Sequence, residues 1–316
     1  MSGPLNAAAG GEPVPPVLTS RRVAGLSNEE LVWLFARLFV EELSLRETAG
    51  AGTEALRSYY GHLLTDGGLF PLGVLGQSLR LAPALARARA LQKGARVLDT
   101  GCGYGSESLL FALTGTATVG VELVEERVAI ARSRIGFYQS RCGFPLAVDF
   151  LNANIFRYLE RAAPFDLIFT MEAISHIYPA DRFLRLARER LTPGGCIVIT
   201  DPNSVNPLAW ARSVRIRGSL RHRPHQRFAD PETGRPVDYG QEQVLSVNRL
   251  CRLLDECGFS VEEAVVSGFL CTSLLPRTIA HDPITYRLLR RMHGVISRIP
   301  ALRSLGSIYT VVGRKR

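Results

Sequence analysis

Between residues 96 and 201 the sequence alternates regularly between short apolar runs and longer stretches, several of which have helical spacing. The runs predict strands at residues 96–99, 117–122, 147–151, 166–171 and 196–201. Neighbouring parallel strands need a crossover of a dozen or more residues, which is usually a helix. The alternation therefore predicts an α/β fold in which helices cover both faces of a mostly parallel sheet. Two later runs, 259–266 and 308–312, predict further strands.

The composition allows such a fold and limits what the charge can indicate. Of the 316 residues, 46% are apolar and 21% are charged, which is enough to bury a large core. The net charge is +9, but 36 of the 38 basic residues are arginine, a bias that a GC-rich genome also produces. A high isoelectric point alone therefore does not predict nucleic-acid binding. The six cysteines include no CxxC pair, so we expect reduced thiols and predict neither a disulfide framework nor a metal site.

The sequence carries no recognisable signal for export or for membrane insertion. The first residues are rich in glycine, proline and alanine, without the basic start and apolar block of a secretory signal. No stretch approaches 18 uncharged apolar residues, the length that predicts a transmembrane helix. We therefore expect a cytoplasmic protein, or one that contacts a membrane from the cytoplasmic side.

Helical and irregular segments precede the alternating core, which is assigned to residues 95–201. Residues 1–25 are small and proline-rich, and are predicted to form a flexible tail. Residues 26–94 are predicted to be helical, because Ser27 and Glu30 have capping-box spacing and apolar residues follow at helical period. The family resemblance described below implies that these helices form a lid.

Two irregular excursions follow the core. Residues 202–245 are rich in proline, arginine and histidine, and predict an inserted segment. The family resemblance described below implies that this insert is a lid over the substrate. Residues 246–316 complete the core but contain a second excursion at 268–305. The first excursion holds an arginine run without acids, at 209–229. Such a run suits an acidic or phosphorylated substrate, and equally a solvated loop.

A glycine-rich turn after the first core strand is the strongest indication of a ligand. The strand ends at Asp99, and glycines follow at positions 101, 103 and 105 before a helix. Such a turn offers backbone N–H groups and the positive end of a helix to a ligand. Ser106 stands where the dinucleotide fingerprint GxGxxG requires its last glycine. Glu122 ends the next strand, where an acid can hold two ribose hydroxyls, so the turn predicts a nucleoside without a phosphate-binding motif.

Four motifs together resemble those of the class I S-adenosyl-L-methionine (SAM)-dependent methyltransferases. They are VLDTGCGYG at 97–105, VGVEL at 119–123, FDLI at 165–168 and LTPGG at 191–195. The resemblance implies a Rossmann-like, seven-stranded sheet with added N-terminal helices and inserted lid segments. It also implies SAM as the cofactor and S-adenosyl-L-homocysteine as the product.

The same resemblance assigns cofactor-binding positions. The positions that would face the methionine moiety are Asp99, Gly101, Cys102, Gly103 and Gly105. Glu122 would bind the ribose, and Leu123 would border the adenine. In many relatives an Asp after the third strand bonds the adenine amino group; here Asn154 takes that position, and an ordinary loop asparagine is the alternative. Ile155 would flank the ring, and Met171 ends the fourth strand beside the cofactor.

The segment after the fourth strand should border the reacting centre, because ligands lie at the carboxyl ends of strands in open α/β sheets. Its pattern of Glu172 followed by His176 is similar to that of methyltransferases acting on sterols, tocopherols, quinones and other lipophilic molecules. His176 is the candidate general base, and Glu172 would orient it or bind the acceptor, with structural roles as alternatives. Tyr60 of the lid is a third candidate catalytic residue, with packing as its alternative. The Asn/Asp-Pro-Pro-aromatic run of nucleic-acid amino-methyltransferases is absent, which argues against nucleic acid as the acceptor.

A basic amphipathic pattern lies in the second excursion. Apolar residues fall on one helical face at positions 284, 288, 292, 295, 296 and 299, and arginines surround them at 287, 290, 291 and 298. This pattern predicts contact of residues 277–305 with an anionic membrane surface or a lipophilic acceptor. An ordinary helix packed on the core is the alternative.

The sequence therefore predicts a SAM-dependent methyltransferase whose acceptor is a hydrophobic small molecule, such as a lipid, a quinone or a polyketide-like compound, methylated at oxygen or carbon. Two alternatives stay open. One is an RNA or protein methyltransferase drawn to its acceptor by the arginine-rich segments, and the other is a SAM-fold protein that binds a partner without catalysis. A homo-oligomer is compatible with the sequence.

Overall fold

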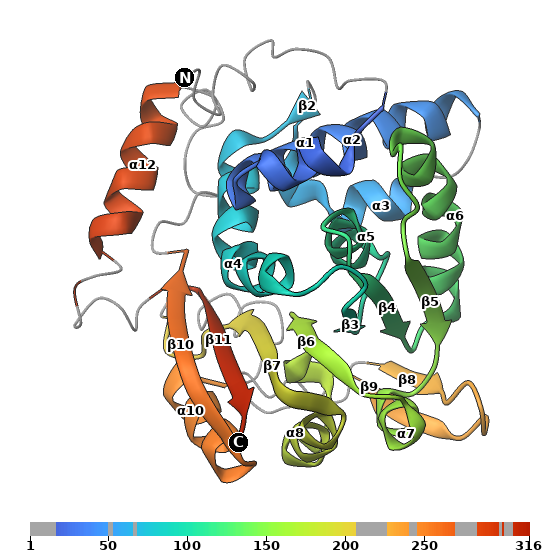
Figure 1. The fold of residues 1–316 in the computed structure, drawn as a ribbon, viewed down its shortest axis with the longest axis vertical. Helices are drawn as coiled ribbons and strands as arrows, with labels where there is room; N and C mark the ends of the chain where they lie inside the picture. The colour runs from blue at the N-terminus through green and yellow to red at the C-terminus, as the bar shows by residue number, and fades with distance from the viewer. Residues whose placement is uncertain are drawn as a thin grey trace.

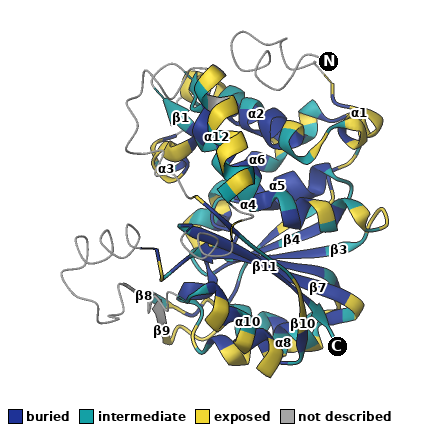
Figure 2. Ribbon diagram, turned by 90° about the vertical axis from the view of Figure 1, so that its left-hand side faces the viewer, coloured by how far each residue is buried: buried dark blue, intermediate teal, exposed yellow. Residues whose placement is uncertain are grey.

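The computed structural model describes residues 17–49, 53–65, 68–206, 226–239, 245–268, 283–296, 299 and 306–316. Helices lie on both sides of a central sheet, and a further helical layer lies outside one of these sides (Figures 1 and 2). No helix within the described residues is both long and apolar enough to cross a membrane.

The central sheet has seven strands in the order β10-β11-β7-β6-β3-β4-β5. Its strands are β3 (Arg96–Thr100), β4 (Ala117–Glu122), β5 (Val148–Asn152), β6 (Phe165–Met171), β7 (Leu191–Pro202), β10 (Phe259–Ser267) and β11 (Ile308–Lys315). The neighbouring strands β7, β6, β3, β4 and β5 all pair in parallel. Strand β11 runs antiparallel to both of its neighbours, β10 and β7. The predicted α/β fold with a seven-stranded sheet is therefore confirmed, although β7 begins earlier than the sequence indicated.

Two apolar cores lie on the two faces of the sheet, because successive strand residues point to opposite faces. The covering helices are α4 (Pro71–Ala90), α5 (Ser106–Leu113), α6 (Glu125–Arg141), α7 (Ile155–Arg161), α8 (Ala180–Glu189) and α10 (Val247–Glu256). Val97 and Phe169 pack with α4, α5 and α6 on one face. Leu98 and Ile168 pack with α7, α8 and α10 on the other. Every residue of α5 is buried, since a second helical layer covers it from outside (Figure 2).

The N-terminal segment forms this outer layer. Its elements are α1 (Ser20–Gly25), α2 (Asn28–Thr48), α3 (Glu54–Tyr59), the 3₁₀ turn η1 (Gly61–Leu63) and the short strands β1 (Leu64–Thr65) and β2 (Gly68–Leu69). The capping box at the start of α2 is confirmed. The Glu30 N–H donates to Ser27 Oγ at 3.2 Å, and the Ser27 N–H donates to Glu30 Oε2 at 2.7 Å.

The prediction of a flexible tail over residues 1–25 is wrong for its last part. Leu18 is fully buried and exchanges backbone hydrogen bonds with the end of α6. Its N–H donates to the Arg141 carbonyl at 2.7 Å, and its carbonyl accepts from the Gly143 N–H at 2.8 Å. Contact with a segment distant in sequence orders this stretch, and local composition cannot reveal such a contact. Residues 1–16 lie outside the described residues.

The two predicted excursions are described in part. They contain the antiparallel hairpin of β8 (Gln226–Ala229) and β9 (Pro236–Tyr239), and the helix α12 (Pro283–Ile296). The hairpin is joined to α7 by an ion pair in which Arg157 Nε lies 3.2 Å from Asp230 Oδ2. Most of the arginine run at 209–229 lies outside the described residues, as do 269–282 and 300–305.

Candidate active site

The turn after β3 has a backbone that only glycine adopts without strain. Gly101, Gly103 and Gly105 have φ values of 68°, 53° and 81°. A Cβ on Gly101 would stand 2.7 Å from the Ala173 Cβ, and one on Gly105 would stand 2.4 Å from Phe150 Cζ. The turn therefore packs tightly between β5 and the segment that follows β6, at the carboxyl end of the sheet.

Glu122 lies beside this turn because β3 and β4 are neighbours, with Thr100 opposite Val121. One carboxylate oxygen accepts a hydrogen bond from the Gly103 N–H at 3.0 Å, and the other accepts one from the Val124 N–H at 3.0 Å. The side chain is only 3% exposed. Each oxygen keeps lone-pair capacity beyond the bond it accepts, so the pair can still receive hydroxyl donors. The sequence reasoning brought these two features together, and the structure places them in direct contact.

Two residues of the predicted cofactor set lie inside the protein. Asp99 is buried, and its Oδ2 accepts a hydrogen bond from Ser108 Oγ of α5 at 2.6 Å. Burial, with the nearby Glu107 carboxylate, raises the pKa of Asp99 to about 8. Cys102 is also buried, and burial raises the pKa of its thiol. Both side chains therefore support the turn from within the protein.

Two asparagines, Asn152 and Asn154, lie where the sequence predicted the adenine to bind. Asn154 is the N-cap of α7, and its Oδ1 already accepts a hydrogen bond from the Phe156 N–H at 3.0 Å. Its Oδ1 has a second lone pair, so the bond to the adenine amino group stays a prediction. Asn152, which the sequence reasoning passed over, donates through Nδ2 to the carbonyls of Glu122 and Leu123 at 3.2 and 2.9 Å. It therefore fixes the end of β4, beside the half-buried Leu123 and Ile155.

Glu172 follows Met171 at the end of β6 and forms an ion pair with a lid residue. Its Oε1 lies 3.0 Å from Nη1 of Arg80, on α4. Its φ is 50°, a left-handed value that is uncommon for a residue with a Cβ and is found at functional sites more often than elsewhere. Glu172 does not cap the 3₁₀ turn η2 (Ile174–His176), whose N-cap, Ala173, makes no side-chain cap bond. The ion pair joins α4 to the carboxyl end of β6, where the acceptor is expected.

The structure distinguishes Tyr60, the catalytic candidate of the sequence, from its neighbour Tyr59. Tyr60, predicted as catalytic, is 3% exposed and packs edge-on against Phe39, inside the helical layer. Tyr59 instead reaches the turn, since its hydroxyl lies 3.0 Å from the position that a Cβ on Gly103 would occupy. Successive helical residues point about 100° apart. The packing of α3 therefore decides which tyrosine faces the site, and the sequence of the helix alone does not.

Further polar residues of the lid approach the same place. Gln77 Nε2 donates to Glu107 Oε1 at 2.9 Å, and both side chains are buried. Burial raises the pKa of Glu107 to about 7. The pKa of His62 is lowered by burial and by the Arg80 charge, against the opposing effect of Glu172. The sequence reasoning missed Gln77 and Arg80, for which polar side chains within the largely apolar stretch of α4 were the available signal. It also missed Glu107, which lies in the first turn of α5.

His176 ends η2 and is half-buried at the carboxyl end of β6, where the sequence predicted it. The preceding residue, Ser175, lies close to a buried acid of β7. Its Oγ is 3.4 Å from Oδ1 of Asp201, which is fully buried. Burial and the Glu172 charge raise the pKa of Asp201 well above its ordinary range. Within the described residues, no group of three or more His, Cys, Asp or Glu side chains is placed to hold a metal ion.

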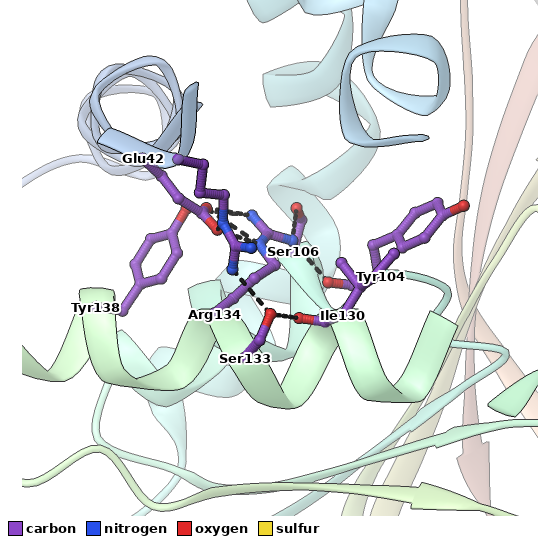
Figure 3. Close-up of polar contacts among 8 residues, drawn as sticks. Glu42, Tyr104, Ser106, Ile130, Ser133, Arg134 and Tyr138 are labelled. Atoms are coloured by element: carbon purple, nitrogen blue, oxygen red, sulfur yellow. Dashed lines mark hydrogen bonds and ion pairs between the residues drawn. The ribbon is translucent and has the colours of Figure 1, made fainter. Parts of the chain in front are cut away.

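A fully buried arginine holds the glycine turn from the side of α6 (Figure 3). Arg134 Nη1 donates to the Tyr104 carbonyl at 2.6 Å and to Ser106 Oγ at 2.9 Å. Its Nη2 lies 3.0 Å from Oε2 of Glu42, which is on α2. The turn is thereby connected to the outer helical layer through charge-assisted hydrogen bonds.

The fold and this site define a nucleoside-binding protein of the Rossmann-like class. The turn, its helix and the acid on the next strand have the positions that such proteins use. A profile of the family described as methyltransferase domain matches residues 76–264, more than half of the chain. The chain therefore belongs to this family, and it is a member of the class I SAM-dependent methyltransferases.

Curated relatives include ubiquinone biosynthesis O-methyltransferases. The chain is 31% identical to that of Caulobacter sp. (strain K31) over 122 residues, which are 38% of this chain and 46% of the relative. It is 29% identical to that of Sinorhizobium fredii over 158 residues, 48% of this chain and 61% of the relative. The chain thus spans about half the length of the curated relatives that it matches. A solved SAM-dependent methyltransferase from Archaeoglobus fulgidus shares 17% identity at a TM-score of 0.47, over 75% of this chain and 92% of that one.

The residues present fit SAM. The N–H groups of Gly101, Gly103 and Gly105 donate to Val121, Glu122 and Cys102, so they hold the turn in shape beside the site. Glu122 offers two acceptor oxygens at the adjacent strand end. Hydrogen-bond acceptors of this kind suit ribose hydroxyls, and the apolar Leu123 and Ile155 suit the flat face of adenine.

Proposed function

We propose that this chain transfers a methyl group from SAM to a hydrophobic small molecule, by O-methylation. The observation that carries the proposal is the contact between Glu122 and the Gly103 N–H, which joins the acid of β4 to the turn of β3. The names of the curated relatives, ubiquinone biosynthesis O-methyltransferases, support oxygen as the methylated atom and a lipophilic ring compound as the acceptor class.

The cofactor, when bound, supplies an electrophilic methyl group on a positively charged sulfur. The protein then has to hold donor and acceptor in line and to remove the proton of the acceptor hydroxyl. Glu122 and the turn hold the donor, with Leu123 and Ile155 beside the adenine. The carboxyl end of β6 and the part of α4 next to it border the acceptor.

Two histidines are candidates for the base at this edge. His176 lies on η2, directly after β6, and His62 lies in the lid near Arg80 and Glu172. A lowered pKa keeps His62 neutral at physiological pH, the form in which an imidazole can accept a proton. Glu172 and Arg80 pair with each other, so their proposed role is to position the lid against the acceptor. We place Tyr59, in preference to Tyr60, at the entrance to the turn.

The test is transfer of labelled methyl from SAM by the purified chain, with hydroxylated quinones and catechols as acceptors and a cell lipid extract as the unbiased source. We expect label in the organic phase, on a product that is one methyl group heavier, and less label with Glu122→Ala at a SAM concentration that does not saturate this variant. Label that appears in RNA or protein fractions would support the alternative acceptors instead. SAM binding without any transfer, across all these fractions, would support a non-catalytic SAM-binding protein.

A further inference from the structure

The helix α12 carries a row of exposed apolar side chains. Ile284, Leu288 and Val295 are 68%, 55% and 60% exposed, and Met292 continues the row. Their spacing places these four residues on one side of the helix. Single exposed apolar residues are ordinary on a protein surface, but a contiguous row marks a surface that contacts something else.

The opposite side of α12 is attached to the protein. Leu289 packs against the apolar core that includes α2 and α4. Arg290 Nη2 lies 2.9 Å from Oε2 of Glu29 at the start of α2. Figure 2 shows α12 beside the outer helical layer, with exposed residues along its length. The helix is therefore fixed in one orientation, and the alternative of an ordinary core helix accounts for Leu289 but not for the exposed row.

The positive charge of α12 favours an anionic partner for the apolar row. Residues 283–296 contain three arginines, at 287, 290 and 291, and no acidic residue. Arg290 pairs with Glu29 on the attached side, whereas Arg287 and Arg291 follow Ile284 and Leu288 by three positions and therefore lie beside the row. An apolar strip bordered by arginines matches the boundary between headgroups and acyl chains of an anionic bilayer. A second copy of the chain would bring like charges together, which opposes self-association through this face.

We propose that the outer face of α12, the row Ile284, Leu288, Met292 and Val295, docks on an anionic lipid bilayer. Docking needs neither SAM nor an acceptor, so it can be tested independently of the proposed function. Its consequence for catalysis rests on that function: α12 contacts α4, the helix that carries Arg80 of the site, so a docked protein holds its lid beside the phase in which a lipophilic acceptor dissolves.

The experiment is vesicle co-sedimentation of the full chain without SAM. The probes are phosphatidylcholine vesicles containing about one third phosphatidylglycerol, and vesicles of phosphatidylcholine alone. We expect binding to the anionic vesicles that weakens in high salt. The double change Leu288→Glu with Val295→Glu should reduce the bound fraction more than about tenfold. Arg291→Gln, which leaves the row intact, should weaken binding about fivefold.

The matched control is Leu45→Glu, since Leu45 is an exposed leucine on another helix, at 51%. It should bind the vesicles as the unmodified chain does. Unfolding curves and calorimetric SAM affinity, measured for every variant, separate lost docking from lost folding. Failure of the unmodified chain to bind, or binding by the double variant at the unmodified level, would overturn the proposal. So would a concentration-dependent dimer that the double variant abolishes, because the face would then serve a second copy.

Discussion

Nη2 of Arg134 lies 3.0 Å from Oε2 of Glu42, and neither side chain is more than 1% exposed. The same guanidinium donates to the Tyr104 carbonyl in the glycine turn. This buried pair therefore connects the outer helix α2 with the part of the site that is expected to hold the methionine moiety. Removing one partner of such a pair leaves a charge in the interior without its counter-charge.

Glu42→Ala should lower the free energy of unfolding by about 3–5 kcal/mol, because the Arg134 charge stays buried without its acid. Urea denaturation followed by circular dichroism measures this. The control is Glu47→Ala on the same helix, which removes an ion pair with Arg57 whose two side chains are each 46% exposed. That change should cost no more than about 1 kcal/mol. Equal losses in the two variants would show that the buried pair has no special role.

Glu122→Ala should weaken SAM binding by about 1–3 kcal/mol, the range for a charged hydrogen bond left unmade. Isothermal titration calorimetry measures the change. Glu126→Ala is the matched control, because Glu126 is an exposed acid at the start of the helix that follows. Its affinity should stay at the level of the unmodified chain. Unchanged affinity in Glu122→Ala would refute the assignment of this acid to the ribose.

The sequence predicted the parts of the molecule that depend on local signals. The alternation of strands and helices follows from apolar periodicity, and the contact of Gly103 with Glu122 follows because β3 and β4 are consecutive and adjacent. The ion pair of Arg80 with Glu172 joins residues 92 positions apart. Its existence depends on where α4 lies over the sheet.

The different positions of Tyr59 and Tyr60 also depend on tertiary packing and could not be predicted from the sequence. Both positions have the same side chain, and only the docking of α3 turns Tyr59 to the glycine turn and Tyr60 to the interior. Periodicity predicts that a helix has a buried side. Which neighbour covers that side is decided by tertiary packing.

His176→Ala should lower turnover about 100-fold, without loss of SAM affinity, if His176 removes the acceptor proton. His62→Ala is the matching change at the second candidate base. Turnover and calorimetry on both variants assign the role, because the base is the residue whose loss reduces kcat alone. A loss of turnover that accompanies lost SAM binding would indicate a structural residue instead. Full activity in both variants would exclude a histidine base at this edge.

Glu107→Gln should change how stability depends on pH. The Glu107 pKa is raised to about 7 from an ordinary 4.5, so the folded state binds more protons than the unfolded state between these values. Stability therefore falls as pH rises through this window, by up to about 3 kcal/mol from this group. Glutamine removes the titration and can still accept from Gln77. The free energy of unfolding at about pH 5 and about pH 8 should thus differ by about 2–3 kcal/mol less in the variant. An unchanged slope would contradict the shifted pKa.

Gly103→Ala should lower SAM affinity about tenfold or more, a loss of about 1.4 kcal/mol. The methyl group would occupy the space beside the Tyr59 hydroxyl, at a φ of 53° that alanine adopts only with strain. Gly136→Ala is the control, because Gly136 lies within α6 and a Cβ there meets nothing within 4 Å. That change should raise stability by about 0.5–1 kcal/mol and leave affinity alone. If Gly103→Ala kept full affinity while losing stability, the open side of the turn would be needed for folding and not for the ligand.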